Sequence, residues 1–377
     1  MNDLIEFRRT IHKNPEISGE EKETARRVRA FIDPLGPDRI YENIGGYGLA
    51  FVFEGKRPGQ TLLFRCELDG LPIEEVNDLE YVSTQKGKGH LCGHDGHMTI
   101  MAGFAKHLSA NRPDAGKVIL LFQPAEETGE GAYRVIQDPE FENLVPDYAF
   151  ALHNLPGYPH SSVVLSDRHF ASASKGVVIT LQGKTSHAGE PERGINPAMA
   201  VSRIIRDLTN LYKQEASFKD FVLITFVHIA LGEIAFGTSA GYAEVRATLR
   251  SYRNDDMHVL SSGAERITAR IAEAEHLKCG ISFVEEFPAT VNDPGAFHFV
   301  EKAAEKHGLE IFRLTRPKKW SEDFGHFTDK YPGVLFGLGS GEDQPDLHNP
   351  DYDFPEQIIG AGIQMYSSIT DQILNGT

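Results

Sequence analysis

The sequence predicts an α/β protein in which a small α+β domain is inserted into a larger, metal-bearing domain with a mostly parallel central sheet. Three largely apolar stretches predict buried strands, because parallel sheets are covered by helices on both faces. These stretches are residues 61–69, 117–122 and 148–152. Each runs into acidic, amide or imidazole side chains, and ligands bind beyond the carboxyl ends of such strands. The sequence therefore predicts a binding site at this edge of the sheet.

Further elements of the larger domain are expected ahead of this edge. Apolar residues recur at helical spacing between residues 4 and 11, and Pro15 ends that helix. Ser18 and Glu21 form a capping-box pattern ahead of a second helix. A further strand is expected near residues 47–53. These elements would supply helices to cover one face of the sheet.

The pattern of the sequence changes near residue 172. The small residues at 171–176 are typical of a linker. The order strand, helix, strand, strand, helix, strand then predicts a split βαβ fold, with elements at 177–182, 196–214, 221–230, 242–251, 257–277 and 281–287. Elements of the larger domain are expected again at 293–307 (helix), 309–315 and 333–338 (strands) and from Pro355 (helix). The expected boundaries are 1–172 and 288–377 for the larger domain and 173–287 for the inserted one.

Composition and charge exclude several classes of protein. The chain of 377 residues carries a formal net charge of −16, which argues against nucleic acid or an anionic membrane as partner. The sequence contains no apolar run long enough to span a bilayer, and its first residues lack the order of a secretion signal. Three scattered cysteines make no disulfide framework, so we expect a cytoplasmic protein.

The segment Gly89–His97 gathers one Cys, three His and one Asp among glycines. Thiolate and imidazole are ligands that zinc and similar divalent metals prefer. Glycine lets the backbone fold closely enough for such side chains to converge. Asp95 is expected to cap a helix through about Leu108, which places Cys92 and His94 on the turn before it. A surface loop that is rich in His by chance is the alternative interpretation.

Several motifs, spread over nearly the whole chain, occur together in one order. They are Arg9–Glu16, Glu67–Pro72, Cys92–His97, Gln123–Glu127, Leu152–His153, Gly183–His187, Gly194–Pro197, Glu322–Phe324 and Leu347–Pro350. In these motifs the chain resembles the aminoacylase-type co-catalytic metallopeptidase and amidohydrolase family. It is most similar to the branch of hippurate hydrolases, indole-acetyl-amino-acid hydrolases and N-acetyl-diaminopimelate deacetylases. The resemblance implies a zinc-peptidase-like catalytic domain and a ferredoxin-like lid that forms a homodimer.

The resemblance also implies roles for individual residues. The matching metal ligands are Cys92, His94, Glu127, His153 and His348. Glu126 matches the general base, Asp69 the acid beside the metals, and His187 a lid histidine that reaches the substrate. Glu67 stands where the wider family has a metal-binding His, and we leave it out of the ligand set because acidic residues are usual there in this branch.

The adjacent pair Glu126 and Glu127 suits these two roles chemically. Neighbouring side chains at a strand end point in different directions, so one acid binds metal while the other handles a proton. Two divalent ions lower the pKa of a shared water, which then attacks an amide as hydroxide. A pair of solvated acids in a loop is the alternative.

The predicted function is therefore a metal-dependent amidohydrolase that cleaves N-acyl amino acids. A dipeptidase or carboxypeptidase of the same family, and a non-catalytic metal-binding relative, are the alternatives. Zinc or manganese is the expected pair of ions, with cobalt or nickel possible. One departure affects the substrate side, since Gly237–Gly241 replaces an Asn-Val-Ile-Pro run of close relatives.

Several further polar residues stay without a firm assignment. His97 is expected to form hydrogen bonds beneath the site, and Asp323 to support it from behind. The roles of His90, His326, Arg246 and Arg250 are left open.

Overall fold

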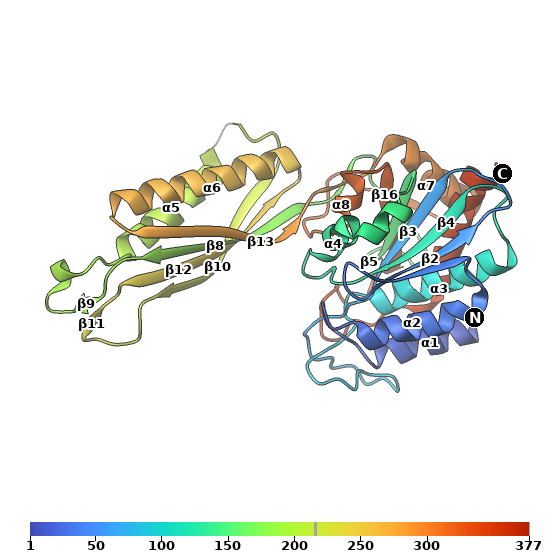
Figure 1. Ribbon diagram of the computed structural model, residues 1–377, viewed down its shortest axis with the longest axis horizontal. Helices are drawn as coiled ribbons and strands as arrows, with labels where there is room; N and C mark the ends of the chain where they lie inside the picture. Colours follow the sequence, from blue (N-terminus) through green and yellow to red (C-terminus); the bar gives the residue numbers. More distant parts are fainter. Residues whose placement is uncertain (215–216, 377) are drawn as a thin grey trace. The chain divides into compact units, whose positions relative to one another are not determined.

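The computed structural model describes residues 1–214 and 217–376, and these divide into two compact units (Figure 1). The larger unit comprises residues 1–170, 290–317 and 322–377, and the smaller unit comprises residues 171–289 and 318–321. Each unit has its own sheet and its own helices. We propose that the two units correspond to the domains expected from the sequence.

An eight-stranded sheet forms the larger unit, in the order β1-β2-β4-β3-β5-β16-β6-β15. Its strands are β1 (Arg39–Ile44), β2 (Gly48–Glu54), β3 (Thr61–Glu67), β4 (Lys117–Gln123), β5 (Tyr148–Pro156), β6 (Val163–Leu165), β15 (Ile311–Arg313) and β16 (Gly333–Gly341). The four central strands, β4, β3, β5 and β16, run parallel to one another. The prediction of a mostly parallel central sheet is confirmed. The antiparallel edge strand β1 is partly exposed and was not predicted.

Seven α-helices are found in the described part of the larger unit. They are α1 (Asn2–His12), α2 (Lys22–Ile32), α3 (His94–Ala110), α4 (Gly131–Gln137), α7 (Pro294–Lys306), α8 (Gly325–Thr328) and α9 (Ile359–Thr370). One apolar core joins α1, α2, α3, α7 and α9 to the sheet, and α3 lies at its centre against α1, α2, α9 and β3. This packing fixes the start of α3 near the carboxyl ends of the parallel strands (Figure 1).

Two predictions about helix caps are wrong. Ser18 does not cap α2; its Oγ donates a hydrogen bond to Asp69 Oδ2 at 2.7 Å instead. The N–H of Thr24 in the first turn of α2 binds Glu16 Oε2 at 2.6 Å, so a different acid satisfies this helix. Helix α3 begins after Gly93, and Asp95 lies in its first turn, where tertiary ion pairs engage its carboxylate.

The smaller unit contains the predicted split βαβ order. Its elements are β8 (Ala173–Gln182), α5 (Ala198–Gln214), β10 (Val222–Leu231), β12 (Tyr242–Ser251), α6 (Asn254–Ala274) and β13 (Lys278–Phe287). The antiparallel sheet has the order β10-β12-β8-β13, and both helices cover one of its faces (Figure 1). This topology confirms the ferredoxin-like prediction.

Two short strand pairs complete the description. Strands β9 (Ser186–His187) and β11 (Thr238–Ser239) pair within the smaller unit. Strands β7 (His169–Ala171) and β14 (Thr290–Val291) pair where the chain leaves and re-enters the larger unit. The linker expected at 171–176 is wrong, because β8 begins at Ala173, and Ala173 and Ser174 are buried in the sheet. No helix among residues 1–214 and 217–376 is long and apolar enough to cross a membrane.

Candidate metal centre

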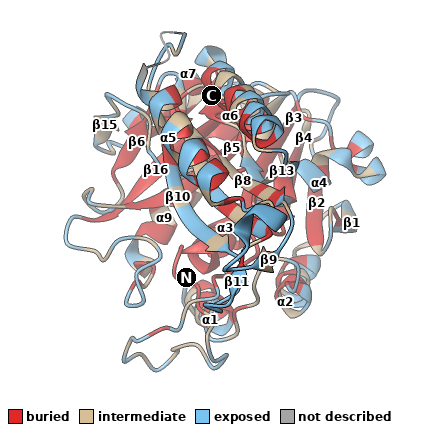
Figure 2. Cartoon of the chain, turned by 90° about the vertical axis from the view of Figure 1, so that its left-hand side faces the viewer, coloured by how far each residue is buried: buried red, intermediate tan, exposed pale blue. Residues whose placement is uncertain are grey.

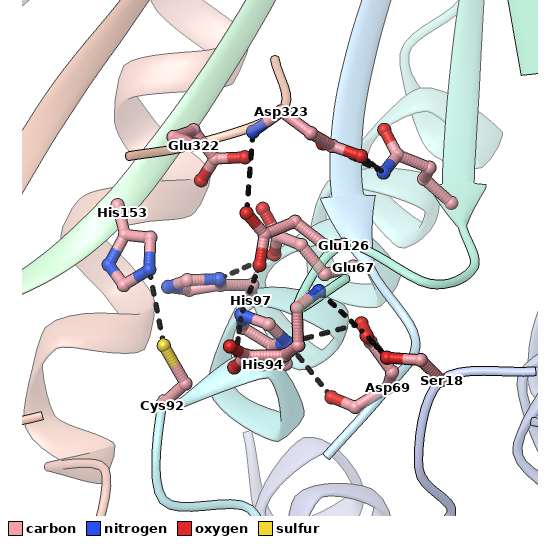
Figure 3. A network of polar contacts seen from close by, with 12 residues as sticks. Ser18, Glu67, Asp69, Cys92, His94, His97, Glu126, His153, Glu322 and Asp323 are labelled. Carbon is pink, nitrogen blue, oxygen red and sulfur yellow. Dashed lines mark hydrogen bonds and ion pairs between the residues drawn. The ribbon is translucent and has the colours of Figure 1, made fainter. Parts of the chain in front are cut away.

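The five predicted ligands and Glu126 form one connected group in the larger unit. Figure 3 shows Cys92, His94, Glu126 and His153 of this group. Their ligand atoms form three overlapping sets, each within 4.8 Å: Cys92, His94 and His153; Cys92, Glu127 and His348; His94, Glu126 and Glu127. Glu126 and Glu127 follow β4, His153 lies in the second half of β5, and Cys92 and His94 stand at the start of α3, as expected for the carboxyl edge of a parallel sheet. The geometry therefore brings together side chains that lie far apart in the sequence.

His94, the first residue of α3, presents one ring nitrogen to this group. Its Nδ1 lies 2.8 Å from the backbone oxygen of Asp69, so Nδ1 carries the proton and donates it. Its Nε2 is buried, has no hydrogen-bond partner within the described residues, and lies 3.9 Å from Glu126 Oε2 and from Glu127 Oε1. Gly93 makes this approach possible, since its φ is 90° and a Cβ there would lie 2.5 Å from Asn154 Oδ1.

Buried polar atoms without partners test whether this group fits divalent cations. Besides Nε2 of His94, the buried oxygens Glu127 Oε1 and Asp69 Oδ1 lack hydrogen bonds to any described residue. Such atoms are costly unless an ion or water satisfies them. A soft thiolate, imidazoles and carboxylates together form a donor set that binds zinc or manganese. The residues present therefore fit a pair of divalent cations.

The acid–base properties of the group support the same interpretation. Burial raises the pKa of the Cys92 thiol and of the Glu126 carboxyl, and it raises the pKa of Glu127 to about 7. Glu322 and Glu127 add to the effect on Glu126 by charge repulsion. Cations and protons compete for such groups, so metal binding here is expected to strengthen as the pH rises.

His153 and His97 occupy similar positions but form different contacts. Nδ1 of His153 lies 2.9 Å from the backbone oxygen of Asn154, and its Nε2 lies 3.5 Å from Cys92 Sγ. His97 uses both ring nitrogens within the protein: Nδ1 lies 2.7 Å from Glu67 Oε2, and Nε2 accepts the N–H of Asn154 at 3.1 Å. His97 thus supports the centre by hydrogen bonding, as expected from the sequence.

His348 approaches from the loop after β16. Its φ is 67°, an unfavourable value for a residue with a Cβ, and its N–H binds the oxygen of Leu91 at 2.8 Å. Its Nε2 lies 3.7 Å from Glu127 Oε2. The hydrogen bond to Leu91 fixes His348 beside the segment that carries Cys92.

A fully buried layer of charge lies behind the centre, and sequence reasoning missed its main cation. Arg65 pairs with Glu67, Asp323 and Glu322, the last at 2.8 Å. Gln123 donates to both oxygens of Asp323 at 2.9 and 2.8 Å, and the N–H of Asp323 faces Glu126 Oε1 at 3.4 Å (Figure 3). The signal in the sequence was an arginine within an otherwise apolar strand, which requires a buried anionic partner.

Asp69 connects the centre to the N-terminal segment. Its Oδ2 accepts hydrogen bonds from Ser18 Oγ at 2.7 Å and from the N–H of Glu127 at 3.0 Å. Its Oδ1 lies 3.5 Å from His94 Nδ1. Asp69 therefore contacts two of the predicted ligands, the ring of His94 and the backbone of Glu127.

Other candidates lie outside this group. His187 belongs to the smaller unit, where it is exposed and its Nδ1 accepts the N–H of Gly189 at 3.0 Å. The departure at Gly237–Gly241 contains β11, whose Thr238 pairs with His187. Arg246 binds Glu244 at 2.6 Å, and Arg250 donates to the oxygen of Lys319 at 2.8 Å. The ring centroids of His326 and Tyr133 lie 5.7 Å apart.

A second buried network, made of charged side chains, surrounds Asp95 in the first turn of α3. Asp95 Oδ2 binds Arg8 at 2.9 Å and lies 3.0 Å from Nδ1 of His12, whose Nε2 lies 3.1 Å from Glu75. Burial lowers the pKa of His12, but Asp95 and Glu75 outweigh it and raise the pKa from 6.5 to about 9. His12 therefore stays protonated and holds α1 against the start of α3.

This network predicts a dependence of stability on pH. Because the folded-state pKa of His12 is raised, its contribution is fully present below pH 6.5 and is lost as the pH rises through about 9. The difference corresponds to about 3 kcal/mol. Urea unfolding of the metal-free protein at pH 6 and pH 9.5 should show this loss in the wild type and a smaller one in His12→Gln. An equal loss in both proteins would contradict the prediction.

Comparisons with known proteins agree with this description. Residues 63–372 match a family described as Peptidase family M20/M25/M40. An N-acetyldiaminopimelate deacetylase of Shouchella clausii is 30% identical over 370 residues, which cover 97% of this chain and 96% of that protein. An IAA-amino acid hydrolase of Arabidopsis thaliana is 29% identical over 381 residues, which cover 98% of this chain and 86% of that protein.

Two solved structures show the same fold. A dinuclear metal-binding peptidase of family M20 from Bacillus subtilis has a TM-score of 0.84 at 23% identity, covering 100% of this chain and 99% of that one. A proposed aminohydrolase from methicillin-resistant Staphylococcus aureus has a TM-score of 0.90 at 24% identity, covering 99% of this chain and 96% of that one.

Proposed function

This chain belongs to peptidase family M20/M25/M40 and is a metal-dependent amide hydrolase, and we propose that its substrates are N-acyl amino acids. The observation that supports this most directly is the position of Glu126. Its carboxylate is buried beside the ligand atoms of His94 and Glu127, yet the predicted ligand set is complete without it. An acid in this position is available for proton transfer.

We assign the proton transfer to Glu126 and metal binding to Cys92, His94, Glu127, His153 and His348. Two divalent cations, when bound, polarise the amide carbonyl and acidify the attacking water. Glu126 takes the proton of that water and delivers it to the leaving amine nitrogen. Asp69 keeps the imidazole of His94 oriented, and burial shields the carboxylate of Glu126 from bulk water.

The substrate class follows from the names of two relatives. One is named for hydrolysis of an IAA-amino acid and the other for deacetylation of N-acetyldiaminopimelate. Each of these names joins an acyl group to an amino acid, so the proposed substrate for this chain is an N-acyl amino acid.

A substrate panel tests the proposal. Metal-free protein reconstituted with zinc or manganese would be assayed on N-acetyl and N-benzoyl amino acids and on dipeptides with a free N-terminus. We expect kcat/KM to be highest for N-acyl amino acids. Preference for free dipeptides would assign the chain to the dipeptidases or carboxypeptidases instead. No hydrolysis of any amide by the metal-loaded protein would refute the proposed function.

We further propose that His187 donates a hydrogen bond to the oxyanion of the reacting amide. Because its Nδ1 accepts the N–H of Gly189, the proton of the neutral ring lies on Nε2, which is then a donor. His187→Ala is expected to lower kcat by about 10²–10³-fold with a smaller change in KM. A rise in KM alone would mean that His187 only positions the substrate, and steady-state kinetics distinguishes the two results.

A cytoplasmic homodimer formed through the smaller unit completes the proposal. Its edge strand β10 and the residues after it expose several large apolar side chains, namely Val227, Ile229, Leu231, Ile234 and Phe236. Strand β10 is largely exposed in Figure 2. Exposed apolar groups on an unpaired edge are typical of a surface that pairs with another chain. Sedimentation velocity would measure the oligomeric state.

A further inference from the structure

The turn that carries both proposed acids contains a residue in an unfavourable backbone conformation. Ala125 has a φ of 51°. The left-handed region brings the Cβ of an L-residue close to the following carbonyl oxygen, a cost that glycine avoids. Residues other than glycine persist in this region where their surroundings hold them there. Since Ala125 directly precedes Glu126 and Glu127, the groups that hold it also determine where both carboxylates point.

Glu21, in the N-terminal segment, fixes the backbone of Ala125 by a hydrogen bond. Its Oε1 accepts the N–H of Ala125 at 2.8 Å, and both residues are buried. Its other oxygen, Oε2, has no hydrogen-bond partner in the described part of the chain. Helix α2, which Glu21 precedes, takes its side-chain hydrogen bond from Glu16 instead. Burying a carboxyl group costs free energy unless it is hydrogen-bonded, and the bond from the N–H of Ala125 is the contact that ties Glu21 to this turn.

The same turn is held at a second N–H group. Asp69 Oδ2 accepts the N–H of Glu127 at 3.0 Å. The carbonyl oxygen of Ala125 accepts the N–H of Gly131 at 3.0 Å, and that of Glu126 accepts the N–H of Gly129 at 2.8 Å. Two buried carboxylates thus bind one backbone N–H on each side of Glu126.

We propose that Glu21 is a positioning residue that holds Ala125 in its left-handed conformation, so that Glu127 points at the metals and Glu126 at the attacking water. This inference rests on the proposed roles of those two acids. Without the acceptor at Glu21, Ala125 relaxes toward a negative φ and both carboxylates turn away from their positions. Metal affinity and turnover then fall together.

The experiment tests whether removing the backbone strain at residue 125 compensates for the loss of Glu21. Glu21→Ala is expected to weaken Zn²⁺ affinity by about 10–100-fold, as for other groups that orient a metal ligand. It should also lower kcat on the best N-acyl substrate by at least about 10-fold, with a smaller change in KM. Ala125→Gly removes the strain, because glycine adopts positive φ without a Cβ clash. The double variant Glu21→Ala/Ala125→Gly should therefore recover most of both losses.

Further variants separate positioning from general destabilisation. Glu21→Gln keeps an oxygen acceptor for Ala125 and should stay within about 3-fold of the wild type. Glu20→Ala removes the same charge from the exposed neighbour and should leave metal affinity unchanged. Glu16→Ala removes the acceptor for Thr24 and should lower Tm without any rescue by Ala125→Gly. If Glu21→Ala does not fold, Glu21→Met fills a similar volume without an acceptor and takes its place.

Two results would overturn the inference: Zn²⁺ affinity of Glu21→Ala equal to that of the wild type, or a double variant no better than Glu21→Ala. Zn²⁺ affinity is measured by competition with a chelator and needs no substrate. If the wild type hydrolyses no amide but its Zn²⁺ affinity falls in Glu21→Ala and recovers in the double variant, the proposed function fails and the role of Glu21 stands.

Discussion

Replacing Glu126 by Gln is expected to lower kcat by about 10²–10⁴-fold while both metal ions stay bound. The amide is close in size to the carboxylate and can still accept the N–H of Asp323 at its oxygen, so the geometry is preserved. What it loses is the ability to take a proton. Steady-state kinetics and metal analysis of the same preparation give kcat and the number of bound ions.

The control for this variant lies four residues further along. Glu130 is exposed and pairs with Arg134, so Glu130→Gln changes the same charge on the same segment without touching the centre. Its kcat should stay within about 2-fold of the wild type, as for most surface substitutions. Activity of Glu126→Gln close to that of the wild type would exclude Glu126 as the general base.

Replacing Cys92 by Ala is expected to have the largest effect on metal content. The Cys92 thiol belongs to two of the three ligand sets, one with His94 and His153 and one with Glu127 and His348. Its loss should weaken binding of both ions by more than the 10–100-fold typical of groups that only orient a ligand. Elemental analysis after gel filtration should show less than one tightly bound ion per chain.

The exposed Cys279 offers the matched control, since Cys279→Ala also removes one thiol. Its metal content should equal that of the wild type. Burial raises the pKa of the Cys92 thiol, so binding a cation there displaces a proton. The amount of bound metal should therefore fall more steeply with decreasing pH in the wild type than in Cys92→Ala. An unchanged stoichiometry in Cys92→Ala would rule out Cys92 as a ligand.

The sequence predicted the central sheet, and it indicated the segments that carry the proposed ligands, because both depend on local pattern. An uninterrupted apolar stretch such as 118–122 has few alternatives to a buried strand, and polar residues at its end must lie at the sheet edge. The cluster around Cys92 and His94 is visible for the same reason, since its members are close neighbours in the chain.

The parts that were not predicted depend on contacts between distant segments. Ser18 and Glu21 have the spacing of a helix cap, but Asp69 and Ala125 bind these side chains more than 50 positions away. Arg65 is partnered by Glu322 and Asp323 from the other end of the chain. A local motif does not reveal which of two compatible partners is present, because tertiary burial decides between them.

The larger unit is built from chain segments that come before and after the smaller unit, and this order affects how the protein is synthesised. Cys92 and His94 leave the ribosome long before His348, and the whole smaller unit is translated between them. At ordinary elongation rates that interval is roughly 13 to 50 seconds. With the proposed ligand set, Cys92 and His94 are therefore synthesised well before His348, and that set is complete only near the end of translation.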